Sequence, residues 1–218
     1  MRLARDGVAV VIHDATLRRT GLVPGSISRL DSKQLAQVDV GTSFNRANRK
    51  LARSEYAQEH IPTLAQVFEL CRNTTATIYV EMKSEDPGTA KELAHAVAKL
   101  VKVFKFRNRV VVISFDHSAI AMLKTLDSSI RTGALFGSSR IGSRNSGEKI
   151  LAAVSDCGAT ELLLHRLLVR RSVVEKAHEA DLPVVVWTVD DPKWVERARL
   201  VKLHALITNH PAKLLAAS

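Results

Sequence analysis

The sequence of 218 residues has few cysteines, few aromatic residues and no long apolar run. Its two cysteines, Cys71 and Cys157, are far apart and lack a CxxC spacing. This argues against a disulfide framework and a cysteine-based zinc site. No apolar run approaches the ~20 residues that a transmembrane helix needs, so a transmembrane protein is excluded. The first residues lack the basic segment and apolar core of a signal peptide, which makes a cytoplasmic protein the default expectation.

Acidic residues are also scarce relative to basic ones. The chain has 32 Lys and Arg against 22 Asp and Glu, a formal net charge of +10. This charge admits a binding module for nucleic acid or an anionic membrane surface. Arginines cluster in four places, which are 18–19, 46–53, 140–144 and 166–171. Because no aromatic residues interleave with them and no nucleic-acid motif is present, we expect scattered solvated charge and no specific nucleic-acid partner.

What the chain does have is an alternation of short β-branched runs with amphipathic segments. The runs that predict strands are 8–13, 77–83, 110–115, 131–136, 161–165, 183–189 and 205–208. The segments that predict helices are 63–71, 89–104, 118–126, 147–154, 172–180 and 192–200. With 46% hydrophobic residues and no compositional break, the pattern predicts one α/β domain over residues 1–218.

The run 183–189 (PVVVWTV) is almost continuously apolar, which is typical of a parallel strand covered by helices on both sides. A (β/α)₈ barrel built from such strands places its site at their carboxyl ends. A doubly wound sheet would do the same, so this pattern leaves both architectures open. Polar residues do follow the runs: His13, Glu81 with Lys83, Ser114, His165, and Thr208 with Asn209.

Two of these positions carry the strongest signal. Charged residues inside an apolar strand need partners, so Glu81 and Lys83 in the Glu-x-Lys sequence favour a functional role. Residues two apart on a strand point to the same face, which predicts that these two side chains lie together. His13 would be able to take and give a proton near neutral pH. The segment 14–60 lacks a clear barrel element and is interpreted as an insertion over one rim of the barrel.

Six motifs occur in one order along the chain: VVIHDATLRRT (10–20), IPTL (61–64), VEMK (80–83), ISFD (113–116), VWTVD (186–190) and ITNHP (207–211). Their order and spacing resemble the glycerophosphodiester phosphodiesterase family. The resemblance implies a TIM barrel with a small insertion. It also implies hydrolysis of glycerophosphodiesters to sn-glycerol 3-phosphate and an alcohol, with a divalent metal such as Ca²⁺ or Mg²⁺ as cofactor.

The resemblance also implies roles for individual residues. His13 matches a catalytic histidine of the family, Glu81 a metal-binding glutamate, and Lys83 a lysine next to the phosphate. Trp187 matches an aromatic residue that lines the substrate pocket. Asn209 stands where the family usually has aspartate, which we interpret as a minor change.

The front of the sequence departs from the family pattern. The His-Arg-Gly and Glu-x-Asp motifs, which would supply a further histidine, an arginine and two metal carboxylates, do not precede His13. We therefore expect a barrel without its first two strands and first helix. The sequence leaves open whether the native gene product carries these elements and whether it has a signal peptide. One carboxylate rarely holds Ca²⁺ or Mg²⁺ tightly, so we expect weak activity or none. Exposed sheet edges predict self-association, and a degenerate barrel that acts as a binding or structural protein is the alternative.

Overall fold

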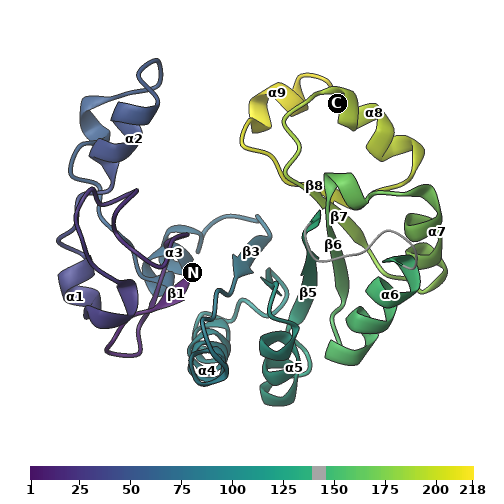
Figure 1. The fold of residues 1–218 in the computed structure, drawn as a ribbon, viewed down its shortest axis with the longest axis horizontal. Helices are drawn as coiled ribbons and strands as arrows, with labels where there is room; N and C mark the ends of the chain where they lie inside the picture. Colours follow the sequence, from purple (N-terminus) through teal and green to yellow (C-terminus); the bar gives the residue numbers. More distant parts are fainter. Residues whose placement is uncertain (139–145) are drawn as a thin grey trace. The chain divides into compact units, whose positions relative to one another are not determined.

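The computed structural model describes residues 1–138 and 146–218. The chain divides into two compact units, Met1–Val110 and Val111–Ser218, which Figure 1 shows in purple to teal and in teal to yellow. The expectation of a single domain over 1–218 stays a prediction. In the described part of the chain, no helix combines the length and the apolar character that crossing a membrane requires.

The first unit opens with a β-hairpin, which corrects one expectation. Residues 8–13 were predicted to be a strand of the parallel sheet. Only β2 (Ala9–Val10) is a strand there, and it pairs antiparallel with β1 (Arg2–Leu3). The turn between them places Gly7 at φ 75°, in the left-handed region that glycine adopts without a steric penalty. The apolar run reflects burial, because Val10 is fully buried, and it does not specify the partner strand.

The segment 14–60 folds as short helices around its own part of the core. These are η1 (Ile27–Arg29), α1 (Ser32–Leu35), α2 (Gly41–Ala47) and η2 (Ser54–Tyr56). An antiparallel bridge between Asp39 and His60 closes the segment around α2 and η2. The buried cluster that holds the segment to the hairpin consists of Ala4, Val10, Ile12, Leu17, Ile27, Leu35 and Ile61. Its placement over a barrel rim stays a prediction.

The remainder of the first unit is α3 (Leu64–Leu70), β3 (Ile78–Glu81) and α4 (Pro87–Val103). Thr63 caps α3 with a capping box. The backbone N–H of Gln66 donates to the Thr63 hydroxyl, and the backbone N–H of Thr63 donates to the side-chain oxygen of Gln66. Asp86 caps α4, and Pro87 follows at the first helical position, where a missing N–H has no cost.

The second unit contains a parallel sheet in chain order. Its strands are β4 (Val110–Ser114), β5 (Arg131–Phe136), β6 (Glu161–His165), β7 (Val184–Trp187) and β8 (Ala205–Leu206). The register places His165 opposite Trp187 at the carboxyl ends of β6 and β7. These strands agree with the predicted runs to within a few residues.

Helices follow each of these strands. They are α5 (His117–Leu126), α6 (Ser146–Cys157), η4 (Arg166–Leu168) with α7 (Arg171–Glu179), α8 (Lys193–Leu200) and α9 (Pro211–Leu215). Gly133 in β5 allows the sheet interior to pack, because a Cβ there would lie 2.2 Å from a methyl group of Leu163. The alternation of strand and helix therefore continues through the whole second unit (Figure 1).

Candidate active site

His13 follows the hairpin strand β2 and is held through both its backbone and its ring. The Arg2 Nε donates to the His13 carbonyl at 3.1 Å, and the same guanidinium bonds Glu85 at 3.0 Å. The His13 Nδ1 lies 2.7 Å from the Asp14 carboxylate, while 71% of the side chain stays exposed. The ring is therefore oriented through Nδ1, and its Nε2 makes no hydrogen bond with the described residues.

Asp14 is held in its ionised form. The Arg19 Nε donates to Asp14 Oδ2 at 2.6 Å, and the second oxygen of the carboxylate faces His13. These two hydrogen bonds lower the pKa of Asp14 from 3.8 to about 2, and the bond from Arg19 has the larger effect. A carboxylate without a proton accepts the hydrogen of Nδ1, which leaves Nε2 of the neutral ring with a lone pair.

Glu81 is the last residue of β3 and Lys83 follows two residues later, and their side chains meet. The Lys83 Nζ donates to Glu81 Oε1 at 2.6 Å, which is the pairing expected for residues two apart on one face of a strand. Both side chains are largely buried, with 16% of Lys83 and 26% of Glu81 exposed. The carboxylate therefore compensates the charge of the ammonium, as a buried charged group requires.

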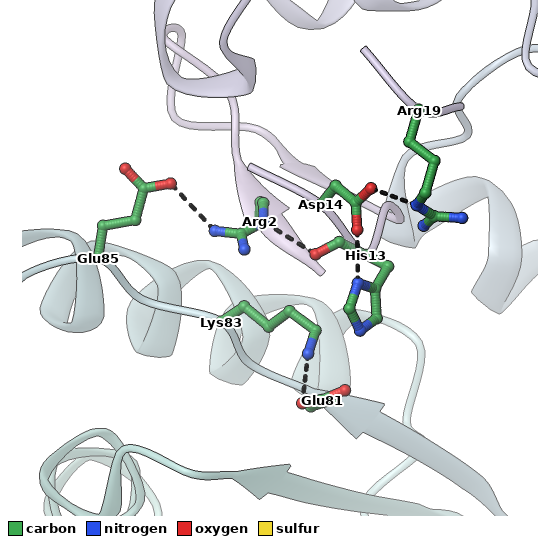
Figure 2. Close-up of polar contacts among 7 residues, drawn as sticks. All are labelled: Arg2, His13, Asp14, Arg19, Glu81, Lys83 and Glu85. Carbon is green, nitrogen blue, oxygen red and sulfur yellow. Dashed lines mark hydrogen bonds and ion pairs between the residues drawn. The ribbon is translucent and has the colours of Figure 1, made fainter. Parts of the chain in front are cut away.

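The N-terminal residues join these two groups of side chains. Met1 pairs with β3, because its amine donates to the Glu81 carbonyl and its carbonyl accepts from the Lys83 N–H. The next residue, Arg2, bonds the His13 carbonyl. Figure 2 shows the His13 ring pointing toward Lys83 and Glu81. Met1 and Arg2 therefore connect the segment of His13 to the segment that carries Glu81 and Lys83.

A divalent cation is not well accommodated by the residues found here. The Glu81 carboxylate is paired with Lys83, and the Asp14 carboxylate with Arg19 and His13. Within residues 1–138 and 146–218, no three His, Cys, Asp or Glu side chains form a group that could hold a metal ion. Because Ca²⁺ takes 6–8 oxygen ligands, one lysine-paired carboxylate does not make a complete site for it.

Trp187 lies in the second unit, at the end of β7, within an aromatic cluster. Its ring meets Phe115 edge-on at 5.3 Å and His165 at 5.1 Å between centroids. Its indole N–H donates to the Leu163 carbonyl at 3.4 Å. Burial lowers the pKa of His165 and the nearby Arg166 lowers it further, so this imidazole is neutral at neutral pH. The cluster presents apolar rings at the carboxyl end of the sheet.

Two other positions at strand ends serve local structure. Asn209 donates its backbone N–H and its side-chain amide to Asp190, at 2.8 and 3.2 Å. An amide suits this position because an aspartate would bring a second carboxylate against Asp190. Ser114 is buried, and its hydroxyl accepts from the Asp116 N–H at 3.0 Å.

Reasoning from the sequence missed the roles of Asp14 and Arg19. Asp14 occurs in the motif VVIHDATLRRT without an assigned role, and Arg19 was interpreted as part of a basic cluster. The five-residue spacing between them has no regular period, so only the folded turn brings their side chains together. The adjacency of Asp14 to His13 was the available signal.

By fold, the chain is a TIM-type α/β barrel protein. The crystal structure of a phosphodiesterase from Oleispira antarctica, in complex with the product sn-glycerol-3-phosphate, matches 99% of this chain and 81% of its own at a TM-score of 0.84 and 23% identity. A glycerophosphoryl diester phosphodiesterase structure from Silicibacter pomeroyi matches 99% and 80% at a TM-score of 0.82 and 21% identity. The described residues supply six strands, β3 to β8, where a complete barrel has eight. The expected barrel, incomplete in this chain, is confirmed.

The chain belongs to the glycerophosphoryl diester phosphodiesterase family, whose sequence profile matches residues 1–213. A glycerophosphodiester phosphodiesterase of Caldanaerobacter subterraneus is 26% identical over 220 residues, which cover 99% of this chain and 82% of that protein. Glycerophosphodiester phosphodiesterase 1 of Bos taurus is 24% identical, and the match covers 87% of this chain and 61% of the bovine protein. The predicted family is therefore confirmed, and it is a family of phosphoric diester hydrolases.

The Arg19–Asp14 contact makes a prediction about pH. In Arg19→Gln we expect the pKa of Asp14 to rise from about 2 toward the ordinary 3.8, because its strongest hydrogen bond is lost. A lowered carboxyl pKa contributes stability that is present above the unfolded pKa of about 4 and is lost as pH falls through about 2. The loss of stability over that window should therefore be smaller in the variant. NMR titration of the Asp14 carboxyl carbon measures the pKa directly.

Arg18→Gln is the matched control, since the exposed Arg18 has the same charge and makes no hydrogen bond or ion pair with the described residues. An equal rise of the Asp14 pKa in both variants would show that net charge, and not the Arg19 hydrogen bond, sets it.

Proposed function

We propose that this chain hydrolyses glycerophosphodiesters to sn-glycerol 3-phosphate and an alcohol, at a low rate. The observation that carries the proposal is the His13 ring, which is oriented by Asp14 and points toward the Lys83–Glu81 pair in Figure 2. Membership of the family supports the reaction and disfavours a degenerate barrel that only binds. The Oleispira antarctica phosphodiesterase binds sn-glycerol-3-phosphate as its product, which supports glycerophosphodiesters as the substrate class.

His13 is proposed as an acid/base residue. In the reaction, the oxygen of a water molecule bonds to phosphorus and loses a proton, the bond from phosphorus to the alcohol oxygen breaks, and the departing alkoxide takes a proton. An imidazole whose Nδ1 faces an ionised carboxylate is suited to accept the proton of the water at Nε2 and to give it to the alkoxide. Asp14 would hold the ring and stabilise its charged form.

Lys83 is proposed to bind the phosphate and to stabilise the charge that grows on its oxygens. Its ammonium is largely buried, which strengthens its interaction with an anion relative to an exposed lysine. The pairing with Glu81 keeps it in place before a substrate binds. The role of Trp187 as a wall of the substrate pocket stays a prediction from the family resemblance.

A divalent cation, Ca²⁺ or Mg²⁺, is proposed as the cofactor, with Glu81 as its one ligand among the described residues. When bound, such an ion would neutralise charge on the phosphoryl oxygens. The described residues do not complete its coordination, which is why we propose slow turnover. Self-association through sheet edges also stays a prediction.

The test is release of glycerol 3-phosphate from glycerophosphocholine by the purified 218-residue chain. Slow release is expected, which rises with added Mg²⁺ or Ca²⁺ and stops with a chelator. Release no faster than in the absence of protein, at every cation concentration, would contradict the proposed activity. Turnover at a rate typical of enzymes, on the order of 10 s⁻¹, would contradict the incomplete site.

A further inference from the structure

A strongly basic surface lies in the first unit, away from the candidate active site residues. We define the basic tip as α2 and the turn that leads to η2, with the side chains of Phe44, Arg46, Arg49, Lys50, Leu51 and Arg53. All six are exposed, and the sequence from 44 to 53 contains four cations and no acidic residue. In Figure 1, α2 and its turn form the end of the first unit that is farthest from α4.

The cations of the basic tip are less neutralised than others on the same unit. Arg5 and Arg72 each bond a carboxylate at 2.6 Å, as part of ordinary surface pairs. In contrast, the structure gives Arg46, Arg49 and Lys50 no hydrogen bond or ion pair from their side chains to any described residue. Three uncompensated cations within five positions produce a local positive potential that attracts anionic groups.

Apolar side chains lie among these cations. Leu51 is 62% exposed between Lys50 and Arg53, and Phe44 is 42% exposed. A single exposed leucine is ordinary on a protein surface. Apolar side chains flanked by cations are instead a pattern that suits the surface of an anionic bilayer. There the cations contact the anionic headgroups, and the apolar side chains contact the acyl chains beneath them.

The turn is held in one conformation by hydrogen bonds at its base. Asn45 spans it, with its side-chain amide donating to the Arg53 carbonyl at 2.8 Å and accepting from the Arg53 N–H at 3.1 Å. Phe44 also packs edge-on against Tyr56 at 5.6 Å. The cations and Leu51 are thus held on one turn before binding, so little conformational entropy of the backbone is lost when a partner binds.

We propose that the basic tip docks on a lipid bilayer surface that carries anionic phospholipids. Charge complementarity selects an anionic partner, and Leu51 selects a surface with an apolar layer beneath its charges. A nucleic acid is the weaker fit, because Phe44 is the one aromatic residue of the tip, and binding of single strands usually relies on several stacking rings. The proposal does not depend on the hydrolytic activity.

The test is sedimentation of the 218-residue chain with vesicles of phosphatidylcholine, with or without phosphatidylglycerol. Binding is expected only to vesicles with phosphatidylglycerol, and it should weaken as salt is added. The variant Arg46→Gln, Arg49→Gln, Lys50→Gln should lose about tenfold or more in affinity. Leu51→Ser should bind more weakly than the wild type without a change in charge.

The matched control is Lys33→Gln, Lys91→Gln, Lys99→Gln, which removes three exposed cations of the same unit outside the tip. It should retain most of the binding. Equal losses in both triple variants would overturn the proposal in favour of diffuse net charge, as would equal binding to neutral vesicles or no binding at all. Binding of duplex DNA that depends on the tip, without vesicle binding, would assign the surface to nucleic acid and overturn the proposal as well. Circular dichroism verifies that each variant is folded.

Discussion

Replacing His13 with alanine is expected to lower the release of glycerol 3-phosphate by about 10²–10⁴-fold, which is the usual contribution of a general acid/base. The physical reason is that no other imidazole in the first unit is oriented by an ionised carboxylate in the described residues. Because 71% of the side chain is exposed, its removal should leave folding unchanged. The rate of release and the midpoint of thermal unfolding measure the two effects separately.

His95→Ala is the matched control for this variant. His95 is exposed on α4, and its ring bonds only the Lys91 carbonyl within its own helix. It should retain the wild-type rate. Added imidazole should restore part of the rate of the His13 variant, since it would replace the lost proton carrier. Equal rates in the wild type and the His13 variant would remove this residue from the proposed site.

Replacing Gly41 with alanine is expected to destabilise the first unit by about 3 kcal/mol or more, because overpacking against an immobile group is costly. A Cβ at Gly41 would lie 1.5 Å from the Tyr56 carbonyl oxygen, which is backbone and unable to rotate away. The start of α2 and the end of η2 would have to separate. Urea unfolding followed by circular dichroism measures the free energy, and trypsin cleavage within the basic tip should become faster.

Gly147→Ala is the control for the glycine substitution. A Cβ there would meet only a methyl group of Val173, at 3.4 Å, which is an ordinary contact. Since alanine favours a helix more than glycine does, we expect a small stabilisation of up to about 1 kcal/mol. If both alanine variants were as stable as the wild type, the close approach of α2 to Tyr56 would be disproved.

Much of the second unit could be predicted from the sequence. A parallel strand covered on both faces must be apolar at nearly every position, and the buried strand β7 has this composition. In the first unit, the helix predicted over 63–71 is α3, and the structure adds that Thr63 caps it. The short helices α1 and α2 were missed, because they have few residues and depend on contacts such as that between Gly41 and Tyr56.

In the candidate site, too, some features follow from the sequence and others depend on tertiary contacts. The sequence by itself determined that Glu81 and Lys83 share a face, because side chains on a strand alternate with a period of two. Only the tertiary structure decided that the apolar run before His13 pairs antiparallel with Arg2–Leu3, since an apolar strand records burial and not its neighbour. It also decided that Arg19 reaches Asp14, because the turn between them has no period that a sequence pattern could reveal.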